Sequence, residues 1–257
     1  MAADLNLKNW PEFINIVSKE TICFFSSDRT DYQLKGNSKD SLITENRKRL
    51  CEGLNINYRD LVCLKQIHGC GIYVATTKDK GRGAVDYNTA IEGFDAIITI
   101  DKAVPVCVLT ADCLSIFFYD TATSGAGIAH AGWRSTKKKI VKKLILKMKE
   151  NYSTNVKNLV VGFGPSIKSC CYEVRQELVN NFAKESIMKK DNRLYLDLVK
   201  ENMIQLIDCG VSHTNIFDSG ICTACNPERF YSYRIGGLAC GRNISIVMLK
   251  NKAAKCY

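Results

Sequence analysis

Histidine, proline and long apolar runs are scarce in this chain of 257 residues, which has three histidines and four prolines. The most apolar stretch, residues 103–119, contains Pro105 and is interrupted by Asp112, so it is a poor membrane span. Residues 1–20 carry charged side chains in place of the unbroken apolar segment of a secretory signal. We therefore expect a cytoplasmic protein that does not enter a membrane.

Acidic residues are outnumbered by basic ones, 26 to 36, which gives a formal net charge of +10. The densest basic run, residues 137–149, places its apolar side chains on one stripe and so predicts a surface helix with a solvated basic face. No aromatic interleaving or nucleic-acid-binding motif accompanies the lysines, so we do not expect nucleic acid as a partner. The charge is compatible with phosphorylated or other anionic substrates.

Cysteine, in contrast, is abundant. The 13 cysteines are odd in number, the chain is long, and nothing directs it to an oxidising compartment, so we expect mostly reduced thiols. Cys222 and Cys225 form a single CxxC, but the nearest other cysteines, Cys209 and Cys240, add neither a second CxxC nor a histidine pair. We therefore interpret Cys222 and Cys225 as ordinary half-buried thiols and not as a structural zinc site.

Helical and extended patterns alternate along the chain without a long linker, a repeat or a low-complexity segment, which predicts one mixed α/β (α+β) domain over residues 1–257. Helices are expected over residues 41–53, 173–183 and 196–209. Apolar, β-branched segments predict strands of a buried sheet. These segments are residues 95–100, 104–109, 114–120, 124–129, 159–163 and 244–249.

Two of the three histidines, His68 and His130, lie close to glycines, and Cys113 lies between them in the sequence. Two histidines and a cysteine are the ligand set of a zinc site that keeps a fourth position open for water or substrate. Cys113 and His130 follow predicted strands, where ligands often bind because rigid elements hold the side chains. We expect these three residues to converge on a catalytic metal ion, with His213 in a surface loop.

Asp112 is a carboxylate in an otherwise apolar run, and it needs a partner such as a ligand histidine, a bound substrate or an arginine. We expect it to take part in catalysis beside Cys113. Ser135 or Thr136 could cap the basic helix, whose first N–H groups, helped by Arg134, would then bind an anion. That arrangement would place phosphate near the metal.

Several motifs, in order over about residues 20–250, make the chain resemble the YfiH-type family. Members of this family were formerly described as polyphenol oxidases or laccases, and are now described as purine nucleoside phosphorylases with adenosine deaminase activity. The matching segments are Gln66–Gly69, Thr110–Cys113, His130–Arg134, Gly164–Ile167, Cys171–Val174, Phe230–Arg234 and Gly241–Arg242.

The resemblance implies a single-domain α/β sandwich with mixed sheets in which His68, Cys113 and His130 bind zinc. It implies phosphorolysis of adenosine, inosine, guanosine and 5'-methylthioadenosine, with deamination of adenosine as a second activity. In zinc deaminases a metal-activated water attacks the base and a glutamate moves the proton, a role for which Asp112 is the candidate here. Contacts to substrate or phosphate are assigned to Asn46, Arg47, Gln66 and Arg134.

The chain departs from the family pattern at two positions. Ser135 replaces the usual glycine after the His130–Arg134 motif, which affects the expected anion-binding turn, and Cys240 stands where a threonine is common. Neither position is an expected metal ligand.

Four alternatives remain open from the sequence. The first is copper in place of zinc, because two histidines and a cysteine also suit a blue-copper site, although three histidines are too few for a multicopper oxidase. The second is a metal-free hydrolase with Cys113 as nucleophile and His130 or His68 as base. The third is an amidase acting on nucleotide-linked cell-wall precursors. The fourth is a non-catalytic protein that retains the pocket.

Overall fold

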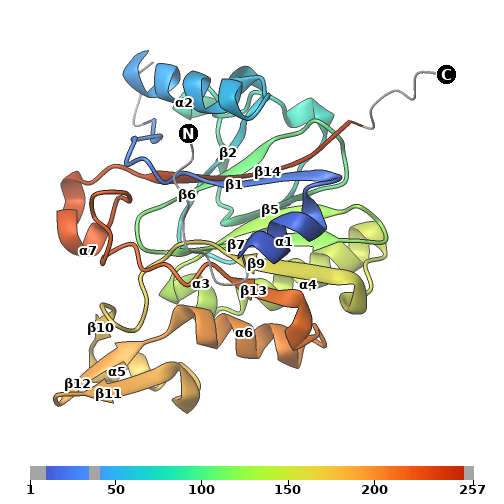
Figure 1. Ribbon diagram of the computed structural model, residues 1–257. Coiled ribbons are helices and arrows are strands. Elements are labelled where there is room, and N and C mark those ends of the chain that lie inside the picture. The colour runs from blue at the N-terminus through green and yellow to red at the C-terminus, as the bar shows by residue number, and fades with distance from the viewer. Residues whose placement is uncertain (1–9, 35–40, 252–257) are drawn as a thin grey trace.

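The computed structural model describes residues 10–34 and 41–251, and its centre is two mixed β-sheets stacked between helices (Figure 1). The first sheet has the order β1 (Thr21–Phe25), β14 (Asn243–Leu249), β6 (Val106–Thr110), β2 (Val62–Lys65) and β4 (Ile91–Glu92). The second has the order β13 (Ile216–Asp218), β9 (Leu159–Phe163), β7 (Leu114–Asp120), β8 (Ala126–Ala131), β5 (Ala96–Thr99) and β3 (Ile72–Val74).

Helices cover the outer faces of both sheets. Figure 1 shows α2 (Ser41–Gly53) over the first sheet, and α4 (Ile140–Tyr152) with α6 (Leu198–Asp208) on the opposite side of the molecule, below the second. The remaining helices are α1 (Trp10–Val17), α3 (Trp133–Lys137), α5 (Gln176–Val179) and α7 (Tyr233–Gly236). A small separate sheet has the order β10 (Glu173–Val174), β12 (Arg193–Leu196) and β11 (Ile187–Lys190), and it projects from the body beside α5 (Figure 1).

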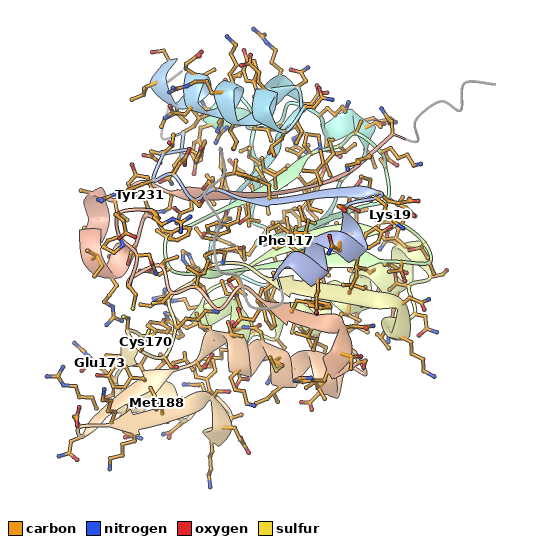
Figure 2. All side chains as sticks on the ribbon, in the orientation of Figure 1. Lys19, Phe117, Cys170, Glu173, Met188 and Tyr231 are labelled. Carbon is orange, nitrogen blue, oxygen red and sulfur yellow. The ribbon has the colours of Figure 1, made fainter. Side chains whose placement is uncertain are left out.

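The alternation of side chains along β7 explains the layers. Every residue of β7 is buried, so both faces of this strand must be covered by apolar groups. Phe117 packs between the two sheets (Figure 2). Its ring centroid lies 6.3 Å from that of Phe13 in α1. Ile116 and Phe118 point the other way and pack against the apolar stripe of α4. Each such side chain contributes roughly 1.5–3 kcal/mol by leaving water.

The predicted strands and most of the predicted helices are confirmed, with two corrections. The strand over 104–109 forms β6, which belongs to the first sheet and not to the sheet of its neighbours in sequence. The helix predicted over 173–183 is wrong, because Glu173 and Val174 pair with β12 and only residues 176–179 are helical. In the described part of the chain, no helix is both long and apolar enough to cross a membrane.

The basic helix is present but starts later than expected. Lys139 has a φ of 60°, and this left-handed residue separates α3 from α4. Neither Ser135 nor Thr136 caps α4; both are buried within α3, which has 5 residues, and the hydroxyl of Thr136 accepts a hydrogen bond from Asn202. The expected cap of the basic helix by Ser135 or Thr136 is therefore wrong.

Candidate metal centre

The three expected ligands come together where the chain crosses from one sheet to the other. His68 lies between β2 of the first sheet and β3 of the second, and Cys113 lies between β6 of the first and β7 of the second. His130 is in β8, opposite Ser115 of β7. The ligand atoms of the three residues all lie within 4.8 Å of one another.

Local backbone geometry brings these side chains together. His68 has a φ of 56° and Asp112 a φ of 86°, so both crossing segments turn sharply through left-handed conformations next to the site. Gly132 leaves room for the thiol, because a Cβ at this position would lie 2.8 Å from Sγ of Cys113. A larger residue there would push the sulfur out of the cluster.

Asp95 supports the centre, and we did not anticipate it from the sequence. This carboxylate has no exposed surface, and its Oδ1 lies 2.8 Å from Nδ1 of His130. It also accepts backbone hydrogen bonds from Ile67, His68 and Gly69 at 3.2, 2.9 and 2.6 Å. Asp95 thus fixes the His68 loop and the His130 ring at once, as carboxylates behind metal-binding histidines do. The one sequence feature that points to Asp95 is its position as a single carboxylate at the start of an apolar strand.

Electrostatics make the cysteine a thiolate at neutral pH. Burial would raise the pKa of Cys113, but the positive charge of His130 and hydrogen bonds from both histidines outweigh it and lower the pKa to about 6. Burial would lower the pKa of His130, yet the Cys113 thiolate and the Asp95 carboxylate raise it to about 9. For Asp95 burial opposes ionisation, and the contact with His130 still brings the pKa below its ordinary value. Metal binding requires the thiolate that this setting favours.

The donor set fits a zinc ion. A thiolate and two imidazoles give a tetrahedral site with one open position. With Nδ1 of His130 held by Asp95, Nε2 is left to face a metal. Among the described residues no fourth histidine, cysteine or carboxylate joins this cluster.

Asp112 has other partners than those expected. Its Oδ1 accepts a hydrogen bond from the Thr223 hydroxyl at 2.7 Å, and its Oδ2 accepts one from the backbone N–H of Arg234, also at 2.7 Å. The carboxylate that binds a ligand histidine is Asp95 and not Asp112. Asp112 therefore ties two distant loops to the segment that carries Cys113, which favours a positioning role over proton transfer.

The expectation that Arg47 and Asn46 contact substrate is corrected by their hydrogen bonds. Arg47 is 1% exposed, and its guanidinium donates to the carbonyls of Tyr32, Gly83 and Ala84 at 2.6–2.9 Å. The Asn46 amide donates to the carbonyl of Asp31. These donors are used inside the protein, so both residues hold loops in place over α2.

Gln66 also has a structural partner. Its amide donates to the carbonyl of Leu109 and accepts from the N–H of the same residue, both at 2.8 Å. Gln66 therefore pins the segment before His68 to the end of β6.

Arg134 is exposed, and its guanidinium carbon lies 4.4 Å from the ring centroid of Trp133. Within the described chain no carboxylate forms an ion pair with it, which leaves its donors for an anion. Tyr172 lies near both Cys113 and Arg134. Its burial, and then the negative charge of Cys113, raise the pKa of its hydroxyl, and the positive charge of Arg134 lowers it. Arg234 covers the Tyr172 ring at 5.6 Å.

His213 is exposed in a short 3-10 turn, as expected.

Comparisons with known proteins agree with the motifs. A family model described as "Multi-copper polyphenol oxidoreductase laccase" matches residues 24–250. The chain is 29% identical to "Purine nucleoside phosphorylase YlmD" of Bacillus subtilis, over 96% of this chain and 94% of that protein. It is 30% identical to "Adenosine deaminase RL5" of an unknown prokaryotic organism, over 81% and 82% of the two chains.

The fold agrees as well. The crystal structure of the hypothetical protein YfiH from Bacillus licheniformis matches with a TM-score of 0.86 at 25% identity, and the match covers 91% of this chain and 94% of that one. The chain therefore belongs to the laccase-domain family, the YfiH-type family that its motifs indicated.

Proposed function

We propose that this chain is a zinc-dependent purine nucleoside phosphorylase that also deaminates adenosine. The observation that carries the proposal is the cluster of His68, Cys113 and His130, supported by Asp95, in a chain whose relatives are named for these two activities. Its substrates are adenosine, inosine, guanosine and 5'-methylthioadenosine, together with phosphate.

A zinc ion held by these three residues supplies Lewis-acid chemistry at an open coordination position. Asp95 keeps the His130 ring in one orientation, and Gly132 leaves space for the Cys113 sulfur. The thiolate at Cys113 is present before a metal arrives, because its pKa is about 6. The protein thus holds the Cys113 thiolate in its binding form at neutral pH, and His130 releases its proton when a metal binds.

Phosphorolysis forms a bond between a phosphate oxygen and C1' of the ribose and breaks the bond from C1' to N9 of the purine. The electron pair leaves with the base, which takes up a proton. Arg134 is the residue suited to hold the phosphate, because its guanidinium is exposed and free of carboxylates in the described chain. Deamination instead adds water at C6 and releases ammonia, with no need of phosphate.

The name of the family model suggests copper oxidation, and the sequence argues against it. A multicopper oxidase needs many histidines, and this chain has three, of which His213 is exposed and outside the cluster. A cysteine hydrolase is the second candidate, because the low pKa of Cys113 beside His130 also describes a thiolate nucleophile and its acid–base partner.

The test is incubation of the protein with adenosine, with and without phosphate, while adenine, inosine and hypoxanthine are measured. We expect phosphate-dependent release of adenine and a smaller, phosphate-independent formation of inosine. Cys113→Ser should abolish both reactions. Cys209→Ser, at a partly buried thiol outside the cluster, should abolish neither. Full turnover by Cys113→Ser would refute the proposal.

A further inference from the structure

A second group of cysteines lies away from the three-ligand centre. Cys170 and Cys171 are consecutive residues just before β10, and Cys222 and Cys225 form the CxxC after β13. The four sulfur atoms all lie within 4.8 Å of one another. The CxxC looked isolated in the sequence because Cys171 and Cys225 are 54 residues apart.

The spacing of these sulfurs suits one tetrahedral ion. With Zn–S bonds of about 2.3 Å, the sulfurs of a tetrahedral site lie about 3.8 Å apart. Sγ of Cys225 lies 3.6 Å from that of Cys170 and 3.3 Å from that of Cys171. These separations exceed the S–S bond length of about 2.05 Å, so the thiols are free and close to the arrangement that a single ion requires.

Backbone donors support a thiolate at Cys222. The N–H of Lys168 lies 3.5 Å from Sγ of Cys222, and the N–H of Cys225 donates to the same sulfur. The ammonium group of Lys168 pairs with Asp218 at 2.8 Å. This lysine is therefore paired with a carboxylate and not with the sulfurs. Cys170 and Cys225 are exposed, which gives an ion a path into the site.

We propose that Cys170, Cys171, Cys222 and Cys225 hold a second, structural zinc ion. All four positions of a tetrahedral ion would be filled by protein, so this site has no opening for substrate. Four thiolates select a soft or borderline metal, and zinc is the usual occupant of such a set.

The site would join two segments that each reach the first centre. Tyr172 follows Cys171 directly and lies under Arg234, whose backbone N–H donates to Asp112. Thr223 lies inside the CxxC and donates its hydroxyl to Asp112, the neighbour of Cys113. Figure 2 shows Cys170 close to Glu173, where the small sheet leaves the body of the molecule. The proposed ion thus fixes one wall of the catalytic centre and the base of the small sheet.

The experiment counts metal ions in protein made in zinc-supplemented medium and purified with a reductant. The wild type and the control Cys209→Ser should contain one zinc ion for each of the two groups. Cys113→Ser should retain the ion of the four-cysteine group, and Cys222→Ser/Cys225→Ser should retain only the other. The Cys113→Ser result does not depend on how the double variant folds, because it leaves all four cysteines intact.

Cobalt substitution gives a second readout. Thiolate-to-cobalt absorption should scale with the number of bound thiolates, which is four in one group and one in the other. Cys113→Ser should keep about four fifths of this absorption, and the double variant about one fifth. Metal-free Cys113→Ser protein, iron with sulfide in the four-cysteine group, or a Cys171–Cys225 disulfide in reduced protein would each overturn the proposal. None of these readouts depends on nucleoside turnover, so this inference and the proposed function fail separately.

Discussion

Asp95→Asn should weaken metal binding at the catalytic centre without changing any proposed ligand. The carboxylate receives four contacts: three backbone N–H groups of the His68 loop and the His130 ring. An asparagine keeps one acceptor oxygen and replaces the other by an NH2 group that faces two donors. The His68 loop and the His130 ring then lose their common anchor.

The expected magnitude follows from the kind of contact that is lost. Changing the partner of a metal-binding histidine reduces metal affinity about 10–100-fold. This corresponds to about 1.4–2.8 kcal/mol of binding free energy. Asp95→Asn should also raise the pKa of the Cys113 thiol, because the carboxylate helps to keep His130 protonated beside it.

The assay is competition for zinc against a chromophoric chelator, with Cys113→Ser protein supplying the background from other sites. Asp120→Asn is the matched control, because Asp120 is also 0% exposed and stands at the far end of β7, about 20 Å from the Cys113 end of that strand. The control should bind zinc as the wild type does. Unchanged affinity in Asp95→Asn, or an equal loss in both variants, would refute the assigned role.

Three further predictions concern single residues. In metal-free protein, alkylation of Cys113 by iodoacetamide should rise with pH to a plateau above a midpoint of about 6; a midpoint near 9 would contradict the thiolate–imidazolium pair. Arg134→Gln should raise the KM for phosphate about 10-fold or more while deamination is unchanged; an equal loss of both activities in steady-state kinetics would count against phosphate binding. Arg47→Met should lower the free energy of unfolding by at least about 3 kcal/mol in urea titrations, because three buried carbonyls lose their donor; a normal stability with a raised KM for phosphate would restore the substrate role.

The local sequence pattern predicts a helix or strand correctly where the segment's own residues determine its structure. The strand over 114–120 is confirmed to the residue because it is an apolar run with both faces buried. The helix over 41–53 is likewise confirmed to the residue. The helix predicted over 173–183 is wrong because Glu173 and Val174 pair with Tyr195 and Leu194 of a later strand, a contact that local propensity does not contain.

The candidate site shows the same limit. His68, Cys113 and His130 stood out because each carries reactive chemistry in an unusual setting, and the structure brings them together. The prediction that Arg47 contacts substrate is wrong because the carbonyls that accept hydrogen bonds from its guanidinium come from loops distant in the sequence. Asp95 is not evident from the sequence for a related reason. Its carboxylate matters only because the loop that carries His68 folds back and donates a backbone N–H to it. Long-range contacts decide such roles, and a single sequence does not display them.

The most direct test of the central claim is removal and restoration of the metal. Wild-type protein is stripped with a chelator under reducing conditions, and adenine release from adenosine and phosphate is measured before and after zinc is returned. We predict that activity is lost on stripping and recovered with zinc in the wild type, and that zinc restores nothing to Cys113→Ser. Undiminished turnover by metal-free wild-type protein would contradict the account and favour Cys113 as a nucleophile.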